Sequence, residues 1–411
     1  MPHFKPYWYV AAESAALRGQ PLRRTLLGEQ IVLWRAAGGQ PVALPDRCLH
    51  RCARLSSGAV RDGLLRCRYH GWGYDAQGCV RLIPAEGGAP AGERQLRAEP
   101  YETREQDGYV YVRLAAPTAA SGDAPPFAMP HWDEAGWGHV RLVNRFAAGV
   151  ADCIENYIDI PHTAFVHDRV FRSSRGERIA ATVERAGGRV RVQYRGERGN
   201  LGFWRRFLNP SGAPVEHEDN FFLPNVTCVR YALANGYRFV ITSQSVPEDE
   251  RHTLVYTDLA YRFGVFTRLA GPFVRRAGRT VIDQDLDILA EQGEVIARHG
   301  RDFRFSAPDR IHRCVDEIRA AIARGEDGRA LPPRPSRSNS SYDLAQPAVL
   351  ALPRRLPARR AGAGRLAAVP ARPAAGGGAA DPSLPAADGL LPPARCTVAD
   401  PRRTEPARPA R

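Results

Sequence analysis

The stretch CLHRCARLSSGAVRDGLLRCRYHGW, residues 48–72, decides the fold of the first part of the chain. Cys48 and His50 stand in a CxH spacing, and Cys67 and His70 follow, after sixteen intervening residues, in a CxxH spacing. Each of two short loops therefore offers one thiolate and one imidazole. Two thiolates and two imidazoles can hold either one tetrahedral zinc ion or a pair of irons.

The distribution of these ligands favours iron over zinc. Zinc sites of this composition usually place two Cys on a hairpin and two His on a helix, whereas each loop here carries one of each. A [2Fe–2S] cluster with two Cys on one iron and two His on the other needs one ligand of each kind from each loop. Small Gly71 and Gly73 would let backbone N–H groups approach the sulfides. We predict such a cluster, with zinc as the alternative.

At this point the stretch resembles the Rieske motif, and CRYHGW, residues 67–72, is similar to its second half in ring-hydroxylating oxygenases. The Rieske proteins of respiratory complexes brace their two loops with a disulfide. Tyr69 stands where the second Cys of that bridge would be, so Cys52 has no such partner. The resemblance therefore indicates the unbraced, lower-potential oxygenase type, with His50 and His70 as the electron exit.

A second motif, ENYIDIPHTAFVHD, spans residues 155–168. Asp159 and His162 are three residues apart and share a helix face. The two histidines of the motif are five residues apart, so a distorted turn must bring them together. Pro161 can supply it, because proline has no N–H to donate to a helix. The candidate residues are Asn156, Asp159, His162 and His167.

An iron that activates O2 needs two His and one carboxylate on one face, which leaves other positions open. Residues 281–295, VIDQDLDILAEQGEV, offer Asp283, Asp285 and Asp287. Helical periodicity favours Asp285, since it shares its face with an apolar stripe and a buried carboxylate needs a partner. Asp283 and Asp287 stay open as alternatives on the wetter side, with Arg279, Gln284 and Glu291. The stripe consists of Val281, Ile282, Ile288, Leu289 and Ile296.

The NxxDxxHxxxxH pattern is similar to the mononuclear-iron motif of the Rieske non-haem iron oxygenases. The resemblance implies that His162, His167 and Asp285 hold Fe(II). It also implies that Asp159 is the aspartate that links a Rieske histidine to an iron histidine across a subunit boundary. From the residues alone, Asp159 can instead be a carboxylate at a helix terminus. Asn156 either supports the site or is an ordinary polar residue of the helix.

The pattern of elements predicts an α+β protein. Alternating apolar segments punctuated by Gly, Pro and Asp predict an all-β domain over residues 1–115. Residues 116–130 form a linker by composition, and residues 131–330 combine strands with helical patterns around 149–168 and 275–325. The resemblance implies a helix-grip fold for this second, catalytic domain.

The last segment, residues 331–411, accounts for much of the net charge. It holds 13 Arg against 5 acidic residues, which is +8 of the total +14, and 15 of the 34 prolines. Such a composition predicts a disordered tail, with a tether to an anionic surface as the alternative. No apolar run approaches the roughly 20 residues that cross a bilayer, and no secretory signal is evident. We therefore expect a cytoplasmic protein without a nucleic-acid partner.

The sequence offers no site at which the chain could collect electrons from a nicotinamide. GAGRLA, residues 362–367, matches a dinucleotide fingerprint only formally, because no strand precedes it. We therefore expect an NAD(P)H-dependent reductase or a ferredoxin as partner. Six further histidines have no ligand spacing and are interpreted as surface or packing residues: His131, His139, His217, His252, His299 and His312.

The chain is thus similar to the α-subunit of a Rieske oxygenase, of the type of vanillate demethylase and the chlorophyllide and pheophorbide oxygenases. The resemblance implies a homotrimer that uses O2 to hydroxylate or O-demethylate a hydrophobic, aromatic or polycyclic substrate. A cis-dihydroxylating dioxygenase is the first alternative. Two other classes stay open, namely a Rieske electron carrier whose second site has lost its metal and a zinc-binding nucleic-acid module.

Overall fold

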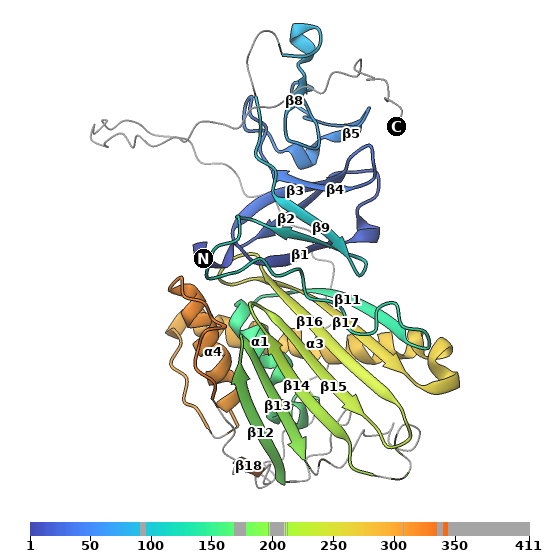
Figure 1. The fold of residues 1–411 in the computed structure, drawn as a ribbon, viewed down its shortest axis with the longest axis vertical. Helices are drawn as coiled ribbons and strands as arrows, with labels where there is room; N and C mark the ends of the chain where they lie inside the picture. The colour runs from blue at the N-terminus through green and yellow to red at the C-terminus, as the bar shows by residue number, and fades with distance from the viewer. Residues whose placement is uncertain are drawn as a thin grey trace, which may run out of the picture. The chain divides into compact units, whose positions relative to one another are not determined.

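A computed structural model describes residues 1–90, 96–167, 178–195, 197, 209, 211, 213–306, 308–334 and 340–343. Up to Arg113 its strands form three small antiparallel sheets, of order β1-β10-β9, β2-β3-β4 and β5-β6-β7-β8 (Figure 1). The prediction of an all-β N-terminal domain is therefore confirmed. The strands are Trp8–Glu13 (β1), Leu22–Leu26 (β2), Glu29–Arg35 (β3), Pro41–Pro45 (β4), Ala59–Arg61 (β5), Leu64–Arg66 (β6), Gly73–Tyr74 (β7), Val80–Leu82 (β8), Glu102–Gln106 (β9) and Tyr109–Arg113 (β10).

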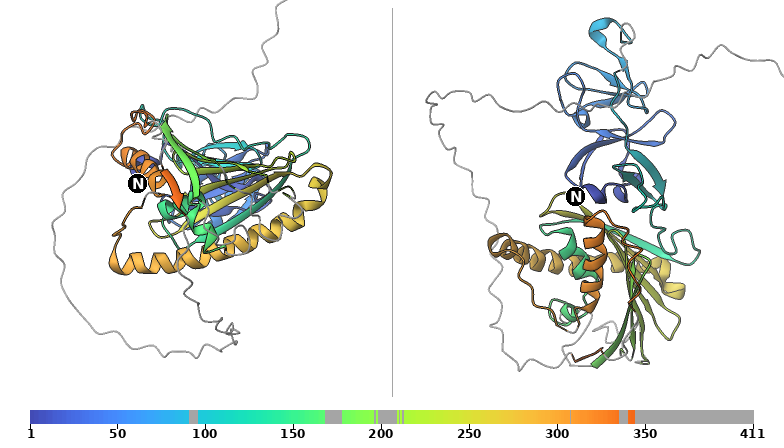
Figure 2. Two further views of the ribbon diagram at one scale, coloured as in Figure 1. Left: turned by 90° about the horizontal axis from the view of Figure 1, so that it is seen from below. Right: turned by 60° about the vertical axis from the view of Figure 1, so that its left-hand side comes forward.

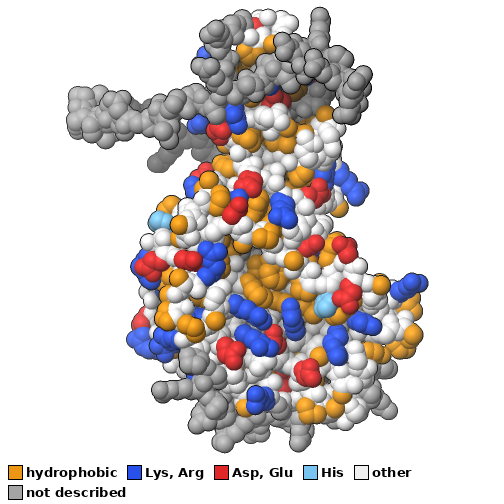
Figure 3. Space-filling model, in the orientation of Figure 1, with side chains coloured by type: hydrophobic (Ala, Val, Ile, Leu, Met, Phe, Trp, Pro, Cys, Tyr) orange, Lys and Arg blue, Asp and Glu red, His pale blue; other side chains and the backbone are white. Residues whose placement is uncertain are grey.

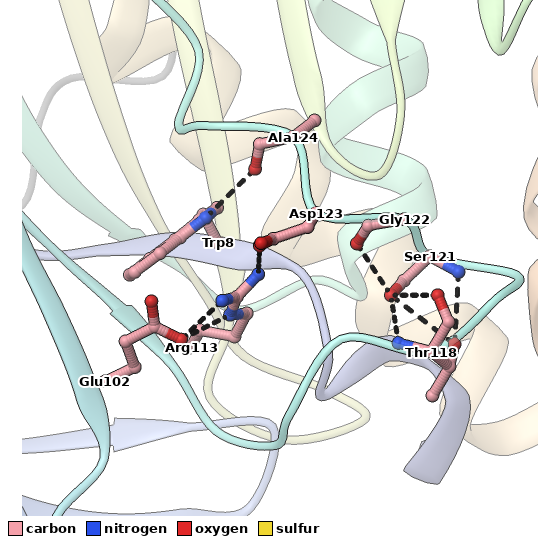
Figure 4. Close-up of polar contacts among 8 residues, drawn as sticks. All are labelled: Trp8, Glu102, Arg113, Thr118, Ser121, Gly122, Asp123 and Ala124. Atoms are coloured by element: carbon pink, nitrogen blue, oxygen red, sulfur yellow. Dashed lines mark hydrogen bonds and ion pairs between the residues drawn. The ribbon is translucent and has the colours of Figure 1, made fainter.

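The segment 116–130 contains no helix or strand, and hydrogen bonds from side chains hold it in place (Figure 4). The buried guanidinium of Arg113 donates to Asp123 Oδ1 at 2.7 Å, and Trp8 Nε1 donates to the carbonyl of Ala124 at 3.1 Å. A turn within it is closed reciprocally: Ser121 N donates to Thr118 Oγ1 at 3.1 Å, and Thr118 N donates to Ser121 Oγ at 2.9 Å. The connection between the two domains is thus held by specific hydrogen bonds.

The second domain is built on one antiparallel sheet of order β11-β17-β16-β15-β14-β13-β12-β18. Figure 2 shows the long helix α3, Thr267–His299, along one face of this sheet. This large sheet with few helices confirms the predicted α+β class. The strands are Gly138–Phe146 (β11), Arg178–Ala186 (β12), Arg189–Arg195 (β13), Glu216–Phe222 (β14), Val226–Ala232 (β15), Arg238–Pro247 (β16), Thr253–Arg262 (β17) and Ser340–Asp343 (β18).

Helix α3 packs closely on its neighbours at two of its three glycines, Gly278 and Gly293. A Cβ on Gly278 would lie 2.6 Å from Cδ1 of Leu259 on β17, and one on Gly293 would lie 2.4 Å from the carbonyl oxygen of Ala147. The buried side of the helix carries residues at helical spacing: Thr267, Val274, Ile282, Asp285 and Leu289. This approach brings α3 against the segment that leads into α1, Val150–Ile158.

The helical pattern at 275–325 was predicted as one stretch, and this is wrong. Helix α3 ends at His299, where Gly300 adopts a left-handed φ of 77°, and a separate helix α4 spans Arg310–Ala323. Arg301, in the connection, donates to both carboxylate oxygens of Asp152 on α1, at 2.7 and 2.5 Å. The chain therefore turns at Gly300, so α4 can pack beside α1.

The two domains share one apolar core and several hydrogen bonds. Core residues of β1 and β10 lie in the same cluster as buried side chains of α1, α4 and the large sheet. Leu27 N donates to Pro247 O at 2.7 Å, and Tyr256 Oη donates to Ala11 O at 2.9 Å. The N-terminal domain is thus packed on the second domain of the same chain.

Within the predicted tail, the structure describes residues 331–334 and 340–343, and both pieces lie beside β12. Arg334 pairs with Arg185 through backbone hydrogen bonds of 3.0 and 3.4 Å, and β18 pairs with β12. These residues join the sheet because the edge strand β12 has unpaired backbone groups to offer. The rest of the predicted tail, with GAGRLA, lies outside the described residues.

Figure 3 shows basic and acidic side chains interspersed over the second domain, where all the basic ones are arginines because Lys5 is the one lysine of the sequence. Several of these arginines are paired, as in Arg191–Glu218 at 2.5 Å and Arg189–Glu218 at 3.3 Å. Among the described residues, no helix is both long enough and apolar enough to span a membrane.

Candidate metal centres

The first candidate centre lies on two loops, one after β4 and one between β6 and β7. Each loop folds back on its own cysteine. At Gly71 the backbone has a left-handed φ of 73°, and a Cβ there would lie 2.9 Å from Pro84, so the second loop requires a glycine. Four backbone hydrogen bonds close the loops: Cys48 N to Ala53 O at 2.8 Å, Cys52 N to Cys48 O at 2.9 Å, Cys67 N to Trp72 O at 2.8 Å and Gly71 N to Cys67 O at 3.0 Å.

These loops bring the four predicted ligands together. Cys48 and Cys67 are both buried, and burial together with the neighbouring Cys48 thiol raises the pKa of Cys67. The rings of His50 and His70 have centroids 4.5 Å apart, and His50 also stacks on Trp72 at 4.8 Å. His70 is exposed and His50 half-buried.

Two observations fit a metal cluster at these loops. His50 Nδ1 is buried and finds no hydrogen-bond partner among the described residues, as expected for an atom that binds a metal. Two buried thiols beside each other are better explained as metal ligands than as packing, because a bound metal deprotonates a coordinating thiol. Tyr74 Oη lies 3.2 Å from Cys48 Sγ and accepts from Leu49 N at 2.9 Å, so a polar group also reaches the thiol.

The second candidate centre joins residues that are far apart in sequence. Ligand atoms of His162, His167 and Asp285 all lie within 4.8 Å of one another. Asp285 Oδ1 is 3.2 Å from His167 Nε2 and 3.7 Å from His162 Nε2, and the two Nε2 atoms are 3.3 Å apart. Burial alone would lower the pKa of His167, but the Asp285 carboxylate raises it. The site thus favours a positive charge at its centre, which suits a divalent metal.

Local structure explains how the histidines converge. Helix α1 ends at Ile158, Asp159 is extended, and Pro161 opens the short 3-10 helix η5, Pro161–Ala164. The interruption expected at Pro161 is present, and it turns both Nε2 atoms towards Asp285 on α3.

Of the three acidic candidates on α3, only Asp285 is buried, with 4% of its surface exposed. The side chain of Asp283 is 58% exposed and lies 3.8 Å from Arg279, and Asp287 is exposed. Helical periodicity therefore selected the residue that the structure brings to the histidines. The predicted apolar stripe was wrong at Ile288, whose surface is 40% exposed. The buried stripe is therefore narrower than helical periodicity predicted.

Two polar partners hold the candidate ligands. Asn156 Nδ2 donates to Asp285 Oδ1 at 3.2 Å, so Asn156 supports the site directly. Gln284 Oε1 lies 2.9 Å from His167 Nδ1, where it accepts the ring N–H and leaves Nε2 for a metal. Sequence reasoning placed Gln284 on the wetter side. The side chain is half-buried instead and reaches sideways along α3.

Asp159 lies beside the same site. Its Oδ2 is 3.3 Å from both the backbone N and the Nδ1 of His162, although the Nδ1 contact lacks the alignment of a hydrogen bond. Its Oδ1 is 3.8 Å from Nε2 of His312 on α4. Burial alone would raise the pKa of Asp159, but the two imidazoles lower it, so it remains a carboxylate.

A further buried polar cluster centres on His217 of β14. Its Nδ1 lies 2.7 Å from Glu197 Oε2, and its Nε2 lies 2.8 Å from Asp219 Oδ1. The ring stacks between Tyr194 and Tyr231, at centroid distances of 4.6 and 4.2 Å. Burial alone would lower the pKa of His217, but the two carboxylates raise it to about 9. From the sequence, His217 was interpreted as an ordinary surface or packing histidine. Asp219 is its neighbour two residues along β14, whereas Glu197 comes from outside the strand.

Comparison with known proteins agrees with this geometry. Residues 7–95 match the Rieske [2Fe-2S] domain, and residues 146–324 match the vanillate O-demethylase oxygenase C-terminal domain. The first match contains both cysteine–histidine loops, and the second contains the histidine pair and Asp285. Rieske domains bind a [2Fe–2S] cluster, and the oxygenases of this family use a mononuclear Fe(II) site.

Curated relatives and solved structures match as well. The chain is 32% identical over 186 residues to a putative toluene-4-sulfonate monooxygenase system iron-sulfur subunit of Comamonas testosteroni, covering 44% of this chain and 51% of that protein. It is 29% identical over 216 residues to the oxygenase component of dicamba O-demethylase of Stenotrophomonas maltophilia, covering 51% and 61%. The alignments thus span about half to three fifths of these relatives.

The fold matches that of a Pseudomonas putida NdmA mutant with caffeine, with a TM-score of 0.66 at 21% identity, over 83% of this chain and 99% of that one. A Rieske domain followed by an oxygenase domain defines a class of non-haem iron proteins. The chain belongs to this class, as a member of the Rieske oxygenase family.

Proposed function

We propose that this chain is the oxygenase component of a multicomponent monooxygenase that hydroxylates or demethylates a hydrophobic, aromatic substrate. The observation that carries the proposal is the convergence of His162, His167 and Asp285 in a chain that also carries the Rieske loops. The two relatives described above have monooxygenase and O-demethylase in their names, which favours these reactions over dihydroxylation.

The residues have separate tasks in this proposal. Cys48, His50, Cys67 and His70 would hold the cluster, and His162, His167 and Asp285 would hold ferrous iron. When bound, the cluster supplies electrons and the ferrous ion supplies the place where O2 is reduced. Gln284 and Asn156 fix the orientation of a ligand ring and of the ligand carboxylate.

Burial defines the side from which the iron site is reached. Asp285 and His167 are 4% and 2% exposed and shield the site from water, whereas the side chain of His162 keeps 17% of its surface exposed. Asp159 lies on this open side, next to His162. It is the carboxylate best placed to meet the cluster histidine of a second copy, as a homotrimer would require.

Electrons must come from another protein. Oxygenase components of this family work with a reductase or a ferredoxin, and the exposed ring of His70 offers the contact point on this chain. The expected cytoplasmic location stays a prediction.

Turnover with a surrogate reductase tests the proposal. Anaerobically purified protein, NADH, reductase and ¹⁸O2 are combined with a panel of methoxylated and non-methylated arenes. We expect substrate-dependent O2 uptake, with formaldehyde from a methoxylated substrate or one ¹⁸O atom in a hydroxylated one. An Asp285→Asn variant should show no substrate-dependent O2 uptake and form no product, although the reductase still reduces its cluster. Two ¹⁸O atoms in the product would identify the dioxygenase alternative, and equal turnover by both proteins would refute the proposed iron site.

A further inference from the structure

Asp159 stands between two imidazoles that come from different parts of the same chain. Its Oδ2 is 3.3 Å from the Nδ1 of His162 in η5, and its Oδ1 is 3.8 Å from the Nε2 of His312 in the first turn of α4. Each carboxylate oxygen of Asp159 therefore has an imidazole nearby, and Oδ2 also accepts from the backbone N of His162.

The place of His312 calls for a reason other than packing. The residue is 3% exposed, and its helix neighbours Ile311, Val315 and Ile318 belong to the apolar core. Its Nδ1 is buried and has no hydrogen-bond partner among the described residues. A buried imidazole costs free energy unless it is hydrogen-bonded or, when protonated, lies beside an opposite charge. An apolar side chain would fill this space without that cost.

The charged groups around His312 are acidic on both helices. Asp159 and Glu155 face it from the side of α1, and Asp309 lies just before α4. Asp316 also interacts with it, from the next turn of α4. Burial alone would lower the pKa of His312, but Asp159 and Glu155 outweigh burial and raise it. At 3.8 Å the contact between His312 Nε2 and Asp159 Oδ1 is too long for a hydrogen bond but within the distance of an ion pair.

We propose that His312 is a positioning residue, which holds one oxygen of Asp159 so that the other faces Nδ1 of the iron ligand His162. The inference rests on the proposed function, since it needs iron at His162. Groups that contact the far nitrogen of a ligating imidazole set its orientation and basicity, and their loss typically weakens metal affinity about 10–100-fold. His312 acts one contact further out, through Asp159.

The test is the Fe(II) affinity of the mononuclear site, measured by chelator competition on full-length protein that carries its cluster. His312→Leu should weaken binding roughly 10-fold, near the lower end of that range. His312→Gln, whose amide nitrogen can take the place of Nε2, should stay within about 3-fold. Val315→Ala, a buried change on the same helix, is the control and should leave the affinity unchanged.

A double-mutant cycle shows whether His312 acts through the carboxylate. In an Asp159→Asn background, His312→Leu should change the affinity less than about 2-fold, because the charge it holds is gone. Equal weakening in both backgrounds, or no weakening in either, overturns the inference. Should His312→Leu not fold, His312→Asn replaces it, since the shorter amide cannot reach Asp159.

The same titration separates this inference from the function on which it rests. Wild-type protein that binds no ferrous ion beyond the cluster overturns the proposed function, and the inference with it. Normal wild-type affinity with an unaffected His312→Leu variant overturns the inference alone.

Discussion

The two candidate metal centres are built in opposite ways. The four candidate cluster ligands lie within 23 consecutive residues, on two loops closed by local backbone hydrogen bonds. The candidate iron site joins a histidine pair to Asp285, which follows His167 by 118 positions and reaches it only because α3 packs against the region of α1. The first centre depends on loop geometry, whereas the second depends on tertiary packing and buried polar partners.

The largest expected effect is the loss of Fe(II) from the candidate iron site while the Rieske cluster stays intact. Asp285→Asn removes the buried carboxylate at the histidine pair, and we expect Fe(II) binding to weaken by more than the roughly 100-fold seen when outer partners are lost. The visible spectrum of the Rieske cluster should not change. Iron analysis together with EPR checks both statements.

Asp283→Asn is the matched control, because Asp283 lies on the same helix but is exposed. Loss of the mononuclear iron in this control as well would mean that the helix, rather than the carboxylate of Asp285, holds the site.

The difference between the two centres also explains which of their residues could be predicted from the sequence. Cys48, His50, Cys67 and His70 were predicted together because their spacing is local. Asp285 was predicted because helix periodicity distinguishes a buried from an exposed acid on one helix. Gln284 was missed because that periodicity says nothing of a long side chain that reaches sideways to His167.

Contacts between distant elements could not be predicted from the sequence. The pairing of His312 with Asp159 depends on how α4 packs beside α1, after a turn at Gly300 that the sequence did not reveal. Likewise, Glu197 meets His217 only through tertiary packing, whereas Asp219 follows His217 by two residues on β14. The fold class, by contrast, followed from alternating strands and helical patterns that are local properties of the chain.

The second-largest expected effect depends on pH and concerns the buried ion pairs of His217. Because the pKa of His217 is raised to about 9, above its ordinary value near 6.5, its ion pairs stabilise the fold fully below about pH 6.5. This contribution, on the order of 3 kcal/mol, is lost as the pH rises through 9. Urea unfolding from pH 6 to 9.5 should show a stability gap between wild type and His217→Gln that narrows as the pH rises.

His252→Gln is the control for this experiment, because His252 pairs with Asp249 at the surface. A gap for His217→Gln that stays constant with pH would show that the ring is neutral in the folded protein.

The third effect weakens the iron site without removing a ligand. Gln284→Leu takes away the acceptor for His167 Nδ1, so the ring loses its fixed orientation. We expect Fe(II) affinity to fall about 10–100-fold, with the cluster unaffected. Chelator competition measures this, and Glu291→Gln on an exposed part of α3 serves as control. Unchanged affinity would show that packing alone orients His167.

The smallest effect is confined to the cluster loops. Tyr74→Phe removes the hydroxyl that lies 3.2 Å from Cys48 Sγ. A hydrogen bond to a ligand sulfur stabilises the reduced, more negative cluster, so its loss should lower the reduction potential. A net bond of about 1 kcal/mol corresponds to roughly 40 mV for one electron. Redox titration followed by EPR measures the shift, and an unchanged or higher potential would exclude this role for Tyr74.

Iron and acid-labile sulfide per chain test the central claim most directly, namely that one polypeptide holds a Rieske cluster and a separate ferrous ion. Anaerobically purified protein should contain iron and sulfide in a ratio of about three to two, as a [2Fe–2S] cluster plus one further iron requires. Replacement of His162, His167 and Asp285 together by Ala should reduce that ratio to about one to one. A one-to-one ratio already in the wild type, or a ratio that the triple replacement leaves unchanged, would contradict the account.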